Sequence, residues 1–234
     1  MRFPLPSTPT APVSSEDVRS LLRDSASILR IRFHEVASAA ATIAAREEFR
    51  RFMVDALSIL SSGAPVLFAD EPPAGRGPRT AWLLNPLDGI DAFRGGFPCF
   101  AVVLGLRDRG RIVAGFVYNP VTEDLFWSDA WTDGAFHRDR RIAARRTGAA
   151  DFGVTADAAG STRYSTALSL CSVASGRADY AIVGDCDWVT REVAGYIVKQ
   201  ADGTVRLTRN GELQASARRR SGFWKGFQWT NGFV

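Results

Sequence analysis

The chain has 234 residues, of which 46% are hydrophobic and 23% are charged, a composition typical of a globular protein with its own core. The formal net charge of +4 is too small to indicate a nucleic-acid partner by itself. No apolar run approaches the ~20 residues that a membrane-spanning helix needs. We therefore expect a protein without a membrane span and without a nucleic-acid partner.

The beginning of the chain and its cysteines bear on its compartment. Residues 1–14 are rich in proline and lack the apolar segment of a signal peptide, so we expect a flexible N-terminal arm. Cys99, Cys171 and Cys186 form an odd set without C-x-x-C spacing, which argues against a disulfide framework. These features predict reduced thiols and a cytoplasmic location.

The first part of the chain alternates between helical and strand patterns. Apolar residues at helical spacing predict one helix over 14–33 and a second over 41–60. The run 66–69 reads as a short buried strand, and a second strand begins with TAWLL at 80–84. After that strand we expect an acidic turn and then a glycine-rich loop, over 85–100.

Beyond residue 100 the pattern is mainly that of strands. Two strands around the turn Asp108–Gly110 predict a hairpin, and aromatic-rich strands continue to about residue 142. The Ala/Gly-rich stretch 145–160 is weakly patterned and predicts a boundary between subdomains. A helix and a strand follow over 164–184. A second such pair begins at Thr190 and ends near residue 207.

Several motifs in a fixed order carry a resemblance to a known family. They are WLLNPLDGIDAF at 82–93, GFPCFAV at 96–102, GFVYNP at 115–120, GAF at 134–136, ALSLCSVASGRAD at 167–179 and AGYIVKQADG at 194–203. The first two are similar to the pattern W-x-x-D-P-[LI]-D-G-T-x-N-F followed by G-x-P-x-F-A-V. In these motifs the chain resembles the inositol monophosphatase family.

The resemblance implies a fold and an assembly. The expected fold is of the α/β (α+β) class, a layered α/β sandwich in which an N-terminal α+β half meets a smaller C-terminal α/β half. We assign 15–145 to the first half and 146–234 to the second. The segment between Phe136 and Ser165 is about half as long as is usual in the family, so we expect a shortened C-terminal half that lacks one helix and a returning strand. The resemblance also implies a homodimer.

The resemblance further implies a chemistry. Members of the family hydrolyse phosphomonoesters with Mg²⁺-bound water, and Mg²⁺ prefers hard oxygen ligands in octahedral geometry. The positions that match the family's metal ligands are Asp70, Glu71, Asn85, the Leu87 carbonyl, Asp88 and Thr190. The catalytic candidates are Asp70, Glu71 and Asp88. The candidates for binding the substrate or its phosphate are Gly89, Ile90, Ser165 and Thr166.

Three of these positions depart from the family pattern. Asn85 replaces an aspartate, Ile90 replaces the threonine that orients the attacking water, and Thr190 replaces a distant aspartate. Asp185 and Asp187 could substitute for that aspartate only if their loop shifts. Because each lost carboxylate removes a full negative charge from beside a divalent cation, we expect weak or absent Mg²⁺ binding. The Tyr164 side chain also adds bulk where a sugar ring would approach.

Two hypotheses remain open at this point. The first is a phosphomonoesterase of a small polyol or sugar phosphate, with a residual single-metal site at Asp70, Glu71 and Asp88. The second is a non-catalytic relative that binds a partner or a small ligand, with Asn85 and Asp88 serving only to hydrogen-bond the turn. The lost carboxylates favour the second hypothesis. The intact Gly89 loop and the Asp70–Glu71 pair support the first.

Two basic segments carry further alternatives. The arginine-rich stretch 138–146 could bind an anion or RNA, although a solvated hairpin edge is the simpler interpretation. The tail 216–234 interleaves basic and aromatic residues. Such a tail could stack single-stranded nucleic acid, close the core or form a partner surface.

Overall fold

A computed structural model describes residues 13–35, 38–61, 63–71, 77–145, 153–156, 164–184, 186–209 and 211–217. Nearly all of the expected N-terminal arm and of the basic-aromatic tail, as well as Asp185, therefore lies outside the described residues.

Among the described residues, the larger of two β-sheets has seven strands whose spatial order follows the chain. The strands are β1 (Val66–Phe68), β2 (Thr80–Asp88), β3 (Ala101–Asp108), β4 (Arg111–Asn119), β5 (Asp124–Asp129), β6 (Ala135–His137) and β7 (Arg140–Ile142). β1 and β2 are parallel, whereas every later neighbour pairs antiparallel. β1 and β2 are therefore the only neighbouring pair in the described part of this sheet that runs in one direction, so that both strands of the pair end at the same edge.

The smaller sheet has four described strands in the order β10-β11-β9-β8. These are β8 (Gly153–Ala156), β9 (Tyr180–Val183), β10 (Thr204–Leu207) and β11 (Leu213–Ser216). β8 pairs parallel with β9, and the other two pairings are antiparallel.

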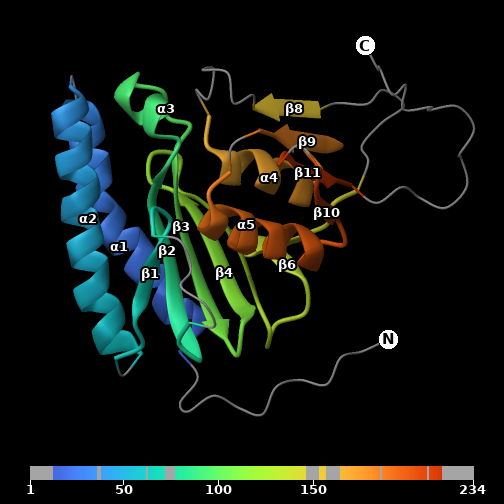
Figure 1. Cartoon of the computed structure of the whole chain (residues 1–234), viewed down its shortest axis with the longest axis horizontal. Helices are drawn as coiled ribbons and strands as arrows, with labels where there is room; N and C mark the ends of the chain where they lie inside the picture. Colours follow the sequence, from blue (N-terminus) through green and yellow to red (C-terminus); the bar gives the residue numbers. More distant parts are fainter. Residues whose placement is uncertain are drawn as a thin grey trace, which may run out of the picture.

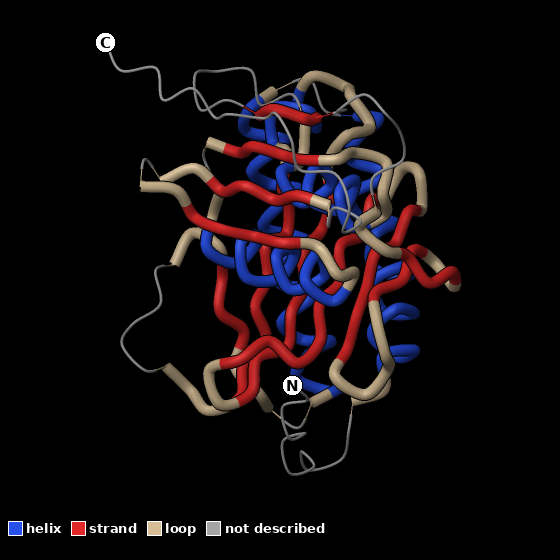
Figure 2. The backbone as a smooth tube through the Cα atoms, turned by 90° about the vertical axis from the view of Figure 1, so that its right-hand side faces the viewer, coloured by secondary structure: helices blue, strands red, loops and turns tan. Residues whose placement is uncertain are grey.

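The helices form two layers. They are α1 (Ser15–Glu35), α2 (Ala39–Leu60), α3 (Ile90–Arg94), α4 (Thr166–Ala174) and α5 (Trp188–Gln200). α1 and α2 cover one face of the large sheet, and α4 and α5 lie between the two sheets (Figure 1). Figure 2 views the molecule from the side of the small sheet, whose strands run across in front of the inner helices. This arrangement confirms the expected layered α/β sandwich. No described helix is long and apolar enough to span a membrane.

Both faces of the large sheet are buried, which explains its nearly continuous apolar strands. Along β2, Trp82 and Leu84 face the core beneath α1 and α2, whereas Leu83 faces the core around α4 and α5. On β3, Val103 faces the core around α4 and α5, and Leu104 faces the core beneath α1 and α2. Because side chains alternate along a strand, one sheet supplies the walls of both cores.

The predicted hairpin and the first two helices are confirmed, but the region after TAWLL differs from the prediction. β2 does not end before Asn85, because it continues to Asp88 through a register shift against β3. Residues 90–94 form the short helix α3 instead of a loop. At the register shift the Asn85 Oδ1 accepts a hydrogen bond from the Leu87 N–H at 3.1 Å, so this N–H is satisfied by a side chain of its own strand.

Candidate functional site

Four elements from distant parts of the chain meet at one end of the inner layer. The parallel strands β1 and β2 end here, with Asp70 just after β1 and Asp88 at the end of β2. The N-termini of α4 and α5 point to the same place, because Ser165 of the α4 N-cap contacts Asp88 and Asp187 of the α5 N-cap contacts Asn85. The structure thus brings the motif around Asn85 together with both inner helices.

Asn85 is nearly buried and uses both ends of its amide. Its Nδ2 donates to the Asp187 Oδ2 at 2.9 Å and to the Thr190 Oγ1 at 3.2 Å. Its Oδ1 accepts from the Leu87 N–H, which fixes the amide orientation because a backbone N–H needs an acceptor. Asn85 therefore presents a donor, and not an oxygen, toward α5.

Asp88 connects the end of β2 to the start of α4. Its Oδ2 accepts from the Ser165 hydroxyl and from the Ala167 N–H, the latter at 2.8 Å. Burial raises the pKa of this carboxyl from its ordinary 3.8 to about 7, with a smaller contribution from the charge of Asp187 and partial compensation by these hydrogen bonds. Asp88 thus acts as an anchor for the N-terminus of α4.

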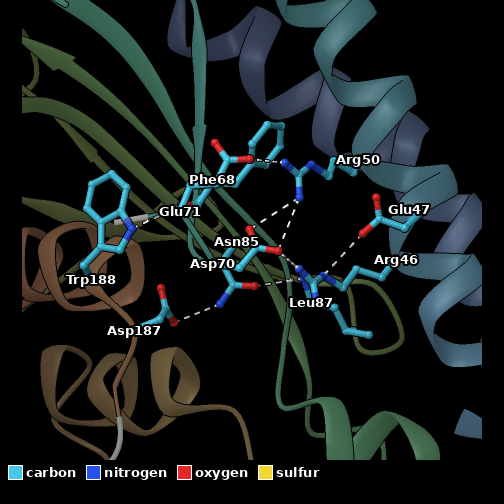
Figure 3. A network of polar contacts seen from close by, with 10 residues as sticks. All are labelled: Arg46, Glu47, Arg50, Phe68, Asp70, Glu71, Asn85, Leu87, Asp187 and Trp188. Atoms are coloured by element: carbon cyan, nitrogen blue, oxygen red, sulfur yellow. Dashed lines mark hydrogen bonds and ion pairs between the residues drawn. The ribbon is translucent and has the colours of Figure 1, made fainter. Parts of the chain in front are cut away.

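The acidic pair after β1 is neutralised by arginines of α2. Arg46 forms an ion pair with Asp70, and Arg50 reaches both Asp70, at 3.3 Å, and Glu71. Figure 3 shows the two arginines reaching from α2 toward this pair, while Asp187 approaches Asn85 from the opposite side. Two guanidinium groups therefore lie where the resemblance would place a cation.

The position of Arg50 is fixed by packing. Its guanidinium carbon lies 3.4 Å from the centroid of the Phe68 ring, a cation–π contact. The Phe68 carbonyl in turn accepts from the Trp188 Nε1 at 3.1 Å, which ties the end of β1 to the start of α5. Arg50 is therefore held from one side by carboxylates and from the other by an aromatic face.

The expected phosphate-binding positions lie at the starts of two helices, with Gly89 and Ile90 at the start of α3 and Ser165 and Thr166 at the start of α4. Gly89 has a left-handed φ of +87°, and a Cβ there would lie 3.0 Å from both the Cys99 carbonyl oxygen and the Ser165 nitrogen. Thr166 is buried in the first turn of α4. Ile90 packs against the core beneath α1 and α2, so its side chain serves the core.

These residues do not fit the divalent metal that the resemblance implies. Mg²⁺ needs several free oxygen ligands around one point. The two carboxylates after β1 are paired with arginines, Asn85 presents an amide N–H, and Asp88 accepts from α4. Within the described residues, no group of three or more His, Cys, Asp or Glu side chains could hold a metal ion.

Sequence reasoning missed two residues of this site and placed a third, Asp187, only conditionally. Arg46 and Arg50 stand four residues apart on α2, a spacing that places them on one helical face, but nothing local identifies their partners. Asp187 was expected to reach the site only after a shift of its loop, whereas it contacts Asn85 directly from the α5 N-cap. An aspartate three residues before a helical Thr190 is a capping signal that could have located it.

Comparisons with known proteins agree with this architecture. A model described as the inositol monophosphatase family matches residues 34–164. The inositol-1-monophosphatase of Mesorhizobium japonicum is 33% identical over 166 residues, which cover 57% of this chain and 62% of that protein. The Nus factor SuhB of Pasteurella multocida is 32% identical over 170 residues, 59% of this chain and 63% of that protein. The chain thus spans about three fifths of the length of these curated relatives.

Solved structures show the same fold. The extragenic suppressor protein SuhB of Bartonella henselae matches with a TM-score of 0.73 at 22% identity, over 86% of this chain and 92% of that one. The IMPase of Thermotoga maritima matches with a TM-score of 0.72 at 20% identity, over 86% and 91% of the two chains. At these identities the likeness concerns the fold alone.

Proposed function

The chain belongs to the inositol monophosphatase family, and from this premise we propose that it keeps a phosphatase-like fold without efficient metal-dependent hydrolysis of phosphomonoesters. In this proposal the protein binds a small phosphorylated metabolite or a protein partner. The relatives offer precedents for both roles by name, since one is an inositol-1-monophosphatase and another is a Nus factor.

One observation carries the proposal: the side chains at the expected ligand positions already have partners from the protein. Asp70 and Glu71 pair with Arg46 and Arg50, and Asp88 accepts from the start of α4. The ion pairs are partly exposed, so each is worth only ~0–1 kcal/mol and could by itself be displaced. The missing carboxylates at Asn85 and Thr190 matter more, because each removes a full charge from beside a divalent cation.

The competing function is a residual single-metal phosphomonoesterase at Asp70, Glu71 and Asp88. The Gly89 turn supports it, because its left-handed backbone passes close to the Ser165 backbone. Against it, hydrolysis would require Mg²⁺ to displace two arginines without the carboxylates that would strengthen its binding. We therefore place Mg²⁺ binding in the millimolar range or weaker.

A paired experiment tests the proposal. Phosphate release from inositol 1-phosphate and from sugar phosphates is measured with Mg²⁺ or Mn²⁺, with the Mesorhizobium relative as the positive control. Mg²⁺ binding is measured in parallel by titration calorimetry. We expect turnover at least a hundredfold below the control and no micromolar metal binding. Micromolar Mg²⁺ affinity, or turnover within tenfold of the control, would overturn the proposal.

We also propose a cytoplasmic homodimer. The three cysteines are free thiols, which is consistent with a reducing compartment. The homodimer rests on the family alone, and light scattering of the purified protein would test it.

A further inference from the structure

A cavity lies away from the candidate site. It has a volume of about 600 Å³ and is lined by Asp124, His137, Arg138, Asp139, Arg140 and Arg177. Arg177 follows the C-terminal end of α4, whereas Ser165 at the other end of that helix contacts Asp88. A nine-residue helix is ~13 Å long, so the two sites lie at opposite ends of α4. We call this second site the hairpin cavity.

The backbone on one side of the cavity is held in place by hydrogen bonds. His137 pairs with Arg140 across the β6–β7 hairpin, which leaves Arg138 and Asp139 as its two-residue turn. The Arg138 N–H donates to the Leu125 carbonyl and its own carbonyl accepts from the Trp127 Nε1, both at 2.7 Å. This wall of the cavity is therefore formed before any ligand arrives.

A glycine places the opposite wall. Gly176 has a φ of +70°, and a Cβ there would lie 3.0 Å from the Arg145 carbonyl oxygen and 3.3 Å from that of Ala143. This close approach lets the end of α4 pack against the segment that follows β7. The Arg177 N–H then donates to the Ser172 carbonyl at 2.9 Å, which fixes the start of the Arg177 side chain.

The charges around the hairpin cavity do not balance. The Asp124 Oδ1 lies 2.7 Å from the His137 Nε2 and 3.3 Å from an Arg138 nitrogen, and Asp139 accepts from Arg19 at 3.0 Å. Both acids in the lining are thus compensated by protein partners.

Two lining arginines remain without compensation. In the part of the chain that the structure describes, the side chains of Arg140 and Arg177 form no hydrogen bond or ion pair. Both side chains are exposed, so they can rotate toward a ligand at little cost. The cavity therefore presents two free guanidinium groups.

We propose that the hairpin cavity binds a small phosphate-bearing anion through Arg140 and Arg177. A guanidinium group presents paired donors that match the oxygens of a phosphate, and two free positive charges match a phosphate dianion. The cavity volume falls within the range of small-molecule sites. Nothing in this proposal depends on metal chemistry at the candidate site.

RNA is the other anion that the arginine-rich segment could bind, but the described residues that line the cavity offer no exposed aromatic ring for stacking. Its one aromatic lining residue, His137, is stacked on Phe126 with ring centroids 4.4 Å apart. Single-stranded nucleic acid is held largely by bases stacked on exposed aromatic rings. The geometry thus favours a compact phosphate over a polynucleotide.

Titration calorimetry with inorganic pyrophosphate, in EDTA-containing buffer at low ionic strength, tests the proposal. We expect binding to the wild type that weakens as salt is added, and at least a tenfold loss of affinity in Arg140→Ala/Arg177→Ala. Arg111→Ala is the matched control. Arg111 is an exposed arginine at the start of β4, whereas the other end of that strand, at Asn119, pairs with Asp124 of the cavity lining. This control should bind like the wild type.

Two further arms locate the ligand. Arg46→Ala/Arg50→Ala should leave pyrophosphate affinity unchanged, and Arg140→Lys/Arg177→Lys should retain part of it. Loss of binding in the Arg46/Arg50 variant, with retention in Arg140→Ala/Arg177→Ala, would assign the phosphate to the candidate site and overturn the proposal. An absence of wild-type binding, or tighter binding of a single-stranded RNA oligonucleotide that depends on the same arginines, would also overturn it.

Discussion

At the level of single residues, the Asn85 amide provides the hydrogen-bond donor that the Asp187 carboxylate accepts from. The amide donates to the carboxylate at 2.9 Å and satisfies its own acceptor within β2. An aspartate at position 85 would instead set a second negative charge against Asp187, a repulsion that only a cation could relieve. The loss of one family carboxylate thus leaves a site that is stable without metal.

The arginine pair leads to a prediction about metal affinity. Removing both guanidinium groups in Arg46→Ala/Arg50→Ala should raise the affinity for Mn²⁺ or Mg²⁺ severalfold, because the metal no longer competes with them for Asp70 and Glu71. Calorimetry measures the change. Arg51→Ala is the control on the same helix, since that side chain bonds only the Glu47 carbonyl among the described residues. Equal metal affinity in both variants would contradict the prediction.

The buried carboxyl of Asp88 predicts a pH dependence of stability. Its pKa rises from 3.8 to about 7 on folding because burial disfavours the charged form, so the folded protein holds this proton more tightly than the unfolded chain. The free energy of unfolding should therefore fall as pH rises from about 4 to about 7, by roughly 1.4 kcal/mol per pH unit at most.

Urea unfolding between pH 4 and pH 8 checks this prediction. Asp88→Asn keeps an acceptor for Ser165 and Ala167 but cannot titrate, so this variant should lose the slope. The partial desolvation of the Asp124 carboxylate is outweighed by hydrogen bonds from His137 and Thr122, so the pKa of Asp124 is lowered. Its titration therefore affects stability mainly below pH 4, outside the range in which Asp88 titrates. An unchanged slope in Asp88→Asn would refute the assignment.

At the level of elements, the site depends on close contact between the α3 turn and the start of α4. Gly89 stands at the N-cap of α3, and the Ser165 N–H donates to the Cys99 carbonyl at 2.7 Å beside it. The N-caps of α4 and α5 are Ser165 and Asp187, so the two inner helices are oriented by residues that also contact β2. Capping and site geometry are therefore coupled here.

A pair of glycine substitutions measures this contact. Gly110→Ala should cost ~1–2 kcal/mol, since Gly110 has a φ of +76° but no atom within 4 Å of a new Cβ. Gly89→Ala should cost more, because its Cβ also meets the Cys99 and Ser165 backbone at 3.0 Å. Urea unfolding compares the two variants. Equal losses would mean that the close approach adds nothing to stability.

At the level of the whole molecule, the site exists only where the layers meet. Asn85 comes from the large sheet and Asp70 from the turn just after its strand β1, whereas Arg50 comes from the outer helices and Thr190 from the inner layer. Restoring the family's ligands therefore requires changes on elements that are far apart in sequence and adjacent in space.

A reconstruction experiment follows from this arrangement. In Asn85→Asp/Ile90→Thr/Thr190→Asp, the new carboxylates lie together, because Asn85 and Thr190 already touch at 3.2 Å. Without metal this variant should melt below the wild type. Mg²⁺ should restore part of the lost melting temperature, because it binds preferentially to the folded state. The recovery should be larger when Arg46→Ala/Arg50→Ala is added to the triple variant.

Thermal melts with and without Mg²⁺, and phosphate release from inositol 1-phosphate, are the measurements. Ile90→Thr alone is the control, because Ile90 packs in the core and its loss destabilises without adding a ligand. A melting temperature of the triple variant that does not respond to Mg²⁺ would show that these positions cannot form a metal site.

The sequence by itself determined the family, the fold class and most of the elements. These rest on local signals: apolar spacing for α1 and α2, the Asp108–Gly110 turn for the β3–β4 hairpin, and motifs such as the one from Trp82 to Phe93. The sequence also identified Asn85, Ile90 and Thr190 as departures from the family pattern, because recognisable motifs locate each of these positions along the chain.

Only the tertiary structure decided what occupies those positions. Arg46 carries no local mark of its pairing with Asp70, and the contact between Asp187 and Asn85 spans 102 residues. The hairpin cavity likewise joins Arg140 to Arg177 across two elements. Such contacts depend on how layers pack, and local spacing does not encode the distance between side chains that are far apart along the chain.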